Sequence, residues 1–229
     1  MIKLVLSFIF SVAFIITGLW DDTETRELSE FDALRVSGAF EILLVKADKP
    51  AIKIEVQGND ELTDIDTEVR NRTLRIENER RNYSGSRKSI LTIYYTTLTE
   101  IEARGAYRIR TEQTLKGESL RLELNGAGNA EFDLDLKRLT VELSGAGTTE
   151  LNGKAVWQDV RMSGAGNYRA FGLQSDTTRV LLNGVGVVEV SVEKSLDAEA
   201  NGIGSVRYRG NPERLRVQAM LLGTIRQIN

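Results

Sequence analysis

Apolar and polar residues alternate through the second half of the chain around a recurring corner. The corner reads Gly-x-Gly, and copies begin at Gly126, Gly145, Gly164, Gly184 and Gly202, at intervals of 19, 19, 20 and 18 residues. Residues four and two positions before each first glycine are apolar, which is typical of a strand with one face turned inward. A regular period of this length predicts a solenoid, because one coil cannot bury its own apolar face but stacked coils bury each other's.

Degenerate copies at Gly105-Ala106-Tyr107 and Leu221-Leu222-Gly223 extend the series to about seven coils. The glycines suit a stacked corner, where neighbouring backbones leave no room for a Cβ. Short polar residues precede the corner and are expected to stack as a ladder: Asn125, Ser144, Ser163, Asn183 and Asn201. The inward positions predicted from the alternation are Ile101, Ala103, Ile109, Leu122, Leu124, Ala130, Phe132, Val141, Leu143, Leu151, Val160, Met162, Ala170, Val180, Leu182, Val188, Val190, Ala198, Ala200, Val206, Tyr208, Val217, Ala219 and Ile225.

One outward row tests this register independently of the glycines. Strands of adjacent coils should lie about 4.8 Å apart, so residues in one row become neighbours. Opposite charges then adjoin along most of the row five positions before the corner, which runs Glu100, Arg121, Thr140, Asp159, Arg179, Asp197 and Arg216.

Residues 26–99 form a less regular β portion ahead of the repeats at 100–229, and we expect one domain over 26–229. Strands are predicted at 34–36, 40–45, 52–56, 66–70, 74–77 and 90–95, with turns at 37–39 and 49–50 and a helical turn at 59–63. The polar segment 79–88 carries four cations and one tyrosine. We interpret it as a solvated hairpin tip, with an anion or glycan contact as the alternative.

Residues 1–20 have the layout of a targeting segment. Lys3 is followed by an almost wholly apolar run from Leu4 to Trp20, which ends at Asp21 and Asp22. This layout predicts a cleaved signal peptide, with a retained N-terminal anchor as the alternative. We therefore expect an exported protein, placed in the periplasm, on the outer membrane surface or outside the cell.

Composition narrows the chemistry. The formal net charge of −3 gives no bias toward nucleic acid, and the chain has neither cysteine nor histidine. It therefore lacks a thiolate nucleophile, the commonest general base and the commonest transition-metal ligand. We expect no enzymatic activity and no cofactor, and assign no catalytic, cofactor-binding or metal-binding residue.

Several local patterns bear on that expectation. The Gly-x-Gly corners lack the third glycine and following helix of a nucleotide site. Two glutamate pairs, Glu123 with Glu142 and Glu131 with Glu150, share outward rows. Their expected spacing, near 5 Å, resembles that of the two carboxylates of a retaining glycosidase and would also suit a hard cation, but solvated surface residues are the plainer interpretation. Four aromatic residues could form a sugar-stacking platform: Phe132, Trp157, Tyr168 and Tyr208. Three of the four have inward phase, for which core packing is the plainer interpretation.

Three motifs together carry a family resemblance: the repeated Leu/Val-x-Leu-Ser/Asn-Gly-Ala-Gly unit, the opening Phe31-x-x-Leu-x-Val-Ser-Gly, and Tyr208-x-Gly-x-Pro. Over about residues 26–229 the chain resembles the bacterial exported proteins of the "putative auto-transporter adhesin, head GIN domain" family. The resemblance implies an all-β, right-handed β-helix-like domain at the cell envelope and specifies no activity. Tyr107 and Leu221 stand where that pattern expects glycine, so the first and last coils are expected to turn differently.

The leading functional hypothesis is a non-catalytic envelope or surface module that binds a glycan or a surface protein. The alternatives are a structural envelope protein without a discrete ligand and a polysaccharide-active enzyme that uses the glutamate rows. Membrane contact is expected only through the N-terminal segment if it stays uncleaved. The last coil ends without a capping helix, so we also expect self-association or partner docking at the exposed C-terminal coil.

Overall fold

The computed structural model describes residues 22–57, 62–78 and 88–229. The predicted targeting segment, the start of the predicted helical turn and nearly all of the 79–88 loop lie outside these residues. Among the described residues, no helix has the length and apolar character needed to cross a membrane.

The N-terminal portion is built from short strands around one long strand, β2. Its elements are β1 (Asp22–Glu27), β2 (Ala33–Lys46), β3 (Ala51–Gln57), the 3-10 turn η1 (Leu62–Asp64), β4 (Ile65–Arg70), β5 (Thr73–Asn78) and β6 (Lys88–Tyr95). Strands β1–β3, β3–β6 and β4–β5 pair antiparallel, whereas β2 pairs parallel with β5, β6 and β7. Strand β1 was not predicted from the sequence.

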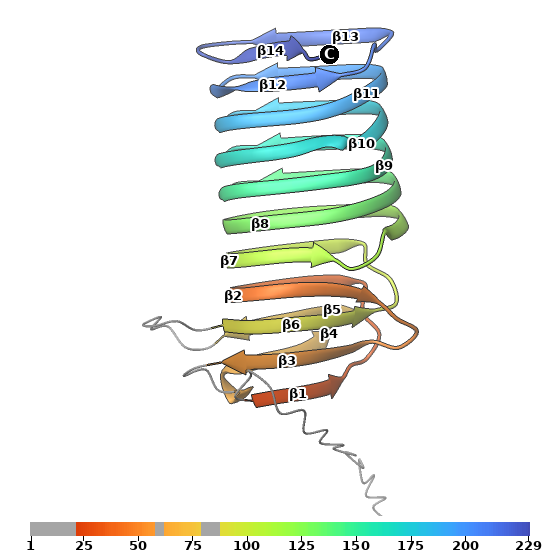
Figure 1. Ribbon diagram of the computed structural model, residues 1–229, viewed down its shortest axis with the longest axis vertical. Coiled ribbons are helices and arrows are strands. Elements are labelled where there is room, and N and C mark those ends of the chain that lie inside the picture. The colour runs from red at the N-terminus through yellow and green to blue at the C-terminus, as the bar shows by residue number, and fades with distance from the viewer. Residues whose placement is uncertain (1–21, 58–61, 79–87) are drawn as a thin grey trace, which may run out of the picture.

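The remaining strands are β7 (Glu100–Thr111), β8 (Leu115–Leu143), β9 (Ala146–Met162), β10 (Ala165–Leu182), β11 (Val185–Ala200), β12 (Ile203–Arg209), β13 (Arg214–Ala219) and β14 (Thr224–Gln227). They wind into a β-solenoid of about six turns over residues 100–227, stacked on the N-terminal portion (Figure 1). The spacing of the corners predicts about seven coils. All pairings between these strands are parallel and in the register that the glycines predict, for example Gly166 opposite Gly147 and Gly186.

The predicted turn at residues 37–39 is wrong. These residues continue strand β2, and Gly38 lies in register with Gly105, which in turn lies opposite Gly126. The segment is therefore the first corner of the stack, which begins in the N-terminal portion. Tyr107 keeps its place in register opposite Phe40 and Gly128. The corner before it does differ in backbone conformation, because Gly105 has a φ of 95° and the first glycines of the later corners have no positive φ.

The predicted inward residues form one core between the two sheet faces, and nearly all are buried. The polar ladder beside the corner is present as well: Ser144 bonds Asn125, and Asn201 donates to Asn183 at 3.2 Å. The last coil departs from the prediction, because Val217 stays 45% exposed. Its side chain has inward phase, but no further coil covers it.

Candidate functional site

Most outward side chains of the sheet face that leads into the corners are charged, and this surface is called here the charged face. Arg35 of β2 lies in register with Arg75 of β5 on one side and Glu102 of β7 on the other. Glu102 is followed by Glu123 of β8. Two arginines and two glutamates thus follow one another across four stacked strands, which the parallel pairing dictates.

Ion pairs bind this row together. Arg35 contacts Glu102 at 3.2 Å and Glu100 at 3.4 Å, and Arg104 also pairs with Glu102. Glu102 is 6% exposed, so its charge is largely removed from water and depends on these two guanidinium groups. The pairs run along and diagonally between strands rather than only along the predicted outward row.

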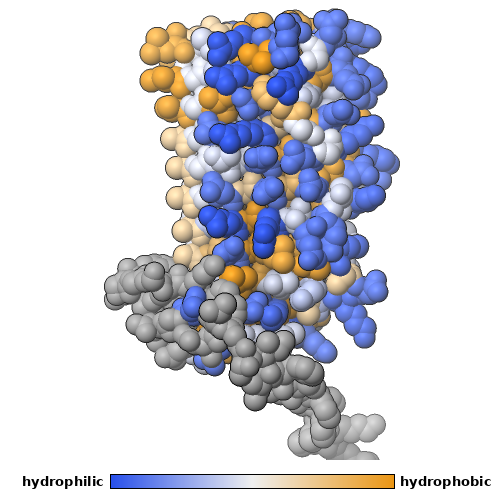
Figure 2. Space-filling model, viewed as in Figure 1, coloured by the Kyte–Doolittle hydropathy of each residue, from blue (hydrophilic) through white to orange (hydrophobic). Residues whose placement is uncertain are grey.

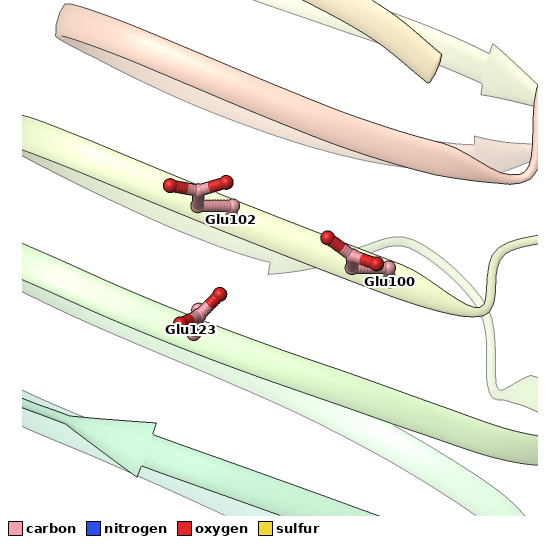
Figure 3. Close-up of side chains that lie close together, drawn as sticks. All are labelled: Glu100, Glu102 and Glu123. Carbon is pink, nitrogen blue, oxygen red and sulfur yellow. The ribbon is translucent and has the colours of Figure 1, made fainter. Parts of the chain in front are cut away.

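Glu100, Glu102 and Glu123 bring one carboxylate oxygen each to within 4.8 Å of one another (Figure 3). Sequence reasoning did not single out this trio, because Glu100 and Glu102 precede a degenerate corner. Their oxygens are of the hard-cation type. However, Arg35, Arg104 and Arg121 already contact members of the trio, so a cation would have to compete with three guanidinium groups.

The predicted pair Glu123 and Glu142 is bridged by an arginine. Arg121 lies 3.5 Å from a Glu123 oxygen and 3.2 Å from a Glu142 oxygen, and Arg161 contacts Glu142 at 3.3 Å. Glu142 is thus held by two guanidinium groups and shares one of them with Glu123. This arrangement favours a structural role for the pair.

The second predicted pair lies on the opposite sheet face. Glu131 and Glu150 are register partners and both are exposed. Arg169 is the next residue in that row and adjoins Glu150. The solvated-surface interpretation fits this pair.

A hollow of about 170 Å³ opens at the N-terminal end of the charged face. Its charged lining consists of Arg35, Arg75, Arg104, Glu77 and Glu102, so arginines outnumber glutamates by three to two. Because Arg35 and Arg75 are direct register neighbours, two like charges adjoin here. We call this feature the arginine hollow. Sequence reasoning missed it, because nothing in the sequence paired strand 74–77 with strand 34–36.

The aromatic platform considered from the sequence is not assembled. Phe132 and Tyr168 are fully buried and Tyr208 is 7% exposed, so these three belong to the core. Trp157 is half-buried, and the Arg138 guanidinium lies 5.9 Å from its ring centroid. No sugar-stacking surface forms from these four residues.

A buried chain of polar side chains crosses the core instead. The Tyr168 hydroxyl donates to Gln158 Oε1 at 2.7 Å, and Gln158 Nε2 donates to Thr178 Oγ1 at 3.4 Å. Burial raises the pKa of Tyr168 well above 10.0, because the phenolate would lose its hydration. With no accessible surface at Tyr168 or Gln158, this chain stabilises the core rather than contacting a ligand.

Solved structures of the same architecture come from Bacteroides and Parabacteroides species. A putative adhesin from Bacteroides fragilis is 25% identical, with a TM-score of 0.84, and the alignment covers 90% of this chain and 96% of that one. A putative adhesin from Parabacteroides merdae is 20% identical with a TM-score of 0.63 (91% and 96% covered). A putative lipid binding protein from Parabacteroides distasonis is 20% identical with a TM-score of 0.68 (91% and 98% covered). No curated protein matches the chain.

A family model matches residues 30–212, from the first buried phenylalanine to the segment after β12. The match covers the corner glycines, the charged face and the arginine hollow. The chain therefore belongs to the family described as "Putative auto-transporter adhesin, head GIN domain".

Proposed function

We propose that this protein is an exported, non-catalytic binding module whose arginine hollow holds an anionic group of a glycan. The observation that carries the proposal is the adjacency of Arg35 and Arg75. Arg75 is exposed and forms no ion pair with any described residue, whereas Arg35 is engaged by Glu100 and Glu102. A free guanidinium beside a second one offers bidentate hydrogen bonds to a carboxylate or sulfate.

The rest of the lining suits a sugar. Glu77 and Glu102 supply acceptors for hydroxyl groups, and Arg104 adds a further donor at the edge of the hollow. The surrounding strands are hydrogen-bonded on both sides, so these side chains project from a rigid backbone. Binding therefore costs little backbone conformational entropy. Membership of a family described as putative adhesins supports the binding role. The ligand class is our inference from the residues that line the hollow.

Binding should be measured with two defined polyanions and a neutral polymer: polygalacturonate, dextran sulfate and dextran. We expect at least one polyanion to bind, dextran not to bind, and Arg75→Ala to weaken binding about tenfold or more. Arg108→Ala is the matched control, because Arg108 is exposed on the opposite sheet face and forms no ion pair with a described residue. Equal binding by the protein and the Arg75 variant would overturn the proposal.

The same polygalacturonate sample separates this proposal from a polysaccharide-active enzyme. An enzyme would release new chain ends, and Glu123→Gln with Glu142→Gln would abolish the release. The bridging of both glutamates by Arg121 supports the non-catalytic alternative. A structural protein without a ligand would bind none of the three polymers.

Location needs a separate experiment, which is protease treatment of intact native cells with a known periplasmic protein as internal control. Cleavage of this protein while the control survives would support a surface module. Protection until the outer envelope is broken would rule out adhesion and leave a periplasmic binding role.

A further inference from the structure

The two ends of the solenoid differ in how they meet solvent. At the N-terminal end, β1 places charged residues at inward positions, and the Arg26 guanidinium donates to the carbonyls of Ile65 and Leu62 at 2.8 and 3.2 Å. Arg26 also bonds Thr67 and Glu24. Inward charges and a satisfied guanidinium prevent another strand from adding there.

No described residue protects the C-terminal end in this way. Strand β13 pairs with β11 only and β14 with β12 only, so each leaves one edge of backbone donors and acceptors open. Every residue of β13 is exposed. Leu215 and Val217 continue the rows of buried Leu196 and Ala198, yet they are 50% and 45% exposed.

Apolar surface gathers at this same end. All large apolar side chains exposed among the described residues lie between residues 185 and 222, except Val156. Val185 and Ile203 stack at the corner, and Met220, Leu221 and Leu222 form the turn between β13 and β14. Figure 2 shows the result as an apolar column along one edge that deepens to orange at the C-terminal end.

We propose that the C-terminal end binds the C-terminal end of a second copy of this chain, so that the protein forms a two-fold dimer. A two-fold axis across the end turns each edge strand antiparallel to its partner, so both open edges gain hydrogen bonds together. A second copy also presents two open strand edges, β13 and β14, at the same distance from each other, with the same exposed apolar side chains between them. A lipid bilayer could not satisfy the open strand edges.

The inward charges of β1 disfavour addition of another strand at the described N-terminal end, so we expect this dimer to be closed rather than to continue into a filament. Strands about 20 Å long on sheets about 10 Å apart outline an end face of roughly 200 Å² per copy. A standard interface buries about 800 Å² per partner, so we expect a weak dimer that forms with rising concentration.

The charges at the C-terminal end predict how dimerisation depends on salt. Arg214, Arg216 and Arg226 are exposed on the edge strands, and Glu213 is the only acidic residue from 207 to 229. Two copies bring these arginines together, so salt should strengthen the dimer by screening their repulsion. Binding of an acidic partner or an anionic lipid at this end would instead weaken with salt.

The test is sedimentation of the protein expressed from the full sequence, from low to high micromolar concentration, at about 0.05 and 0.5 M salt. We expect a monomer–dimer equilibrium that tightens several-fold at the higher salt. Val217→Glu should leave a folded monomer, and Val156→Glu, the matched exposed apolar position elsewhere, should leave the dimer unchanged. A monomer at all concentrations, or an unchanged dimer in the Val217 variant, would overturn the proposal.

Orientation is tested by single labels, which the absence of native cysteine makes straightforward. A fluorophore on Gln218→Cys in β13 should show energy transfer between copies, and one on Thr25→Cys in β1 should not. Transfer between the two different labels, or growth beyond dimer mass, would indicate head-to-tail stacking and contradict the model. Binding to vesicles of phosphatidylcholine with phosphatidylglycerol, without dimers, would also contradict it.

Discussion

Gly147 lies directly against the carbonyl of Gly128 in the preceding coil, so closely that a Cβ on Gly147 would stand 1.8 Å from that oxygen. Its φ of 141° also disfavours any other residue. Neither neighbour can move, because both belong to hydrogen-bonded strands. We therefore expect Gly147→Ala to lower the free energy of unfolding by about 3 kcal/mol or more, measured by urea unfolding.

Gly117 provides the control for that substitution. A Cβ there would meet only the Leu136 side chain, at 3.7 Å, which is an ordinary contact. Gly117→Ala should be neutral or stabilise by about 0.4–1 kcal/mol, because it restricts the unfolded chain. Similar losses for both variants would mean that close stacking at the corner is not what requires glycine.

The corner was predictable because its requirement is local and recurs with a regular spacing, so the sequence displays it many times. The arginine hollow depends on a different kind of fact, namely that Arg75 packs beside Arg35 from a strand 40 residues away. That pairing occurs once, so it produces no repeating pattern in the sequence. Likewise, Gln158 is a polar residue, so the alternation of apolar residues gives no sign that it is buried. Its hydrogen bond with Tyr168 therefore could not be predicted from the sequence.

Arg121 offers a test of the charged face. It separates two glutamates that would otherwise repel each other, but its side chain is 41% exposed and solvent screens the interaction. We expect Arg121→Met to cost about 0.2–1 kcal/mol at low salt and less at high salt. Thermal unfolding of this variant and of Arg108→Met at two salt concentrations measures the difference, and a salt-independent loss would point to packing instead.

Tyr168→Phe should change how stability depends on pH. Near neutral pH the variant loses about 1–3 kcal/mol, because Gln158 Oε1 is left without its buried donor. Above pH 10.0 the unfolded wild-type chain releases the Tyr168 proton while the folded chain retains it, since burial raises the folded pKa. Wild-type stability therefore falls as pH rises through that range, and the variant lacks this contribution.

The gap between wild type and the Tyr168 variant should accordingly narrow from neutral to strongly alkaline pH in urea unfolding curves. Tyr95 and Tyr107 also have a raised pKa through burial, but they titrate equally in both proteins. A constant gap would show that Tyr168 is hydrated enough to ionise in the folded state.

A substitution at Leu221 tests the stability of the monomer and the strength of the dimer separately. Leu221 adopts a φ of 57° and is 86% exposed, in the turn that Gly223 closes by donating to the Met220 carbonyl at 3.0 Å. The family pattern expects glycine here, and left-handed leucine costs about 1–2 kcal/mol. Leu221→Gly should therefore raise the free energy of unfolding of the dilute monomer by up to about 1 kcal/mol, after the entropy of glycine is counted, and a higher thermal midpoint would show it.

The same substitution removes apolar surface from the proposed dimer end, so it should weaken dimerisation several-fold. If Leu221 serves dimerisation, its replacement must stabilise the monomer and weaken the dimer. A gain in monomer stability with unchanged dimerisation would leave Leu221 as a strained surface residue, and sedimentation of the variant beside the wild type decides between the two.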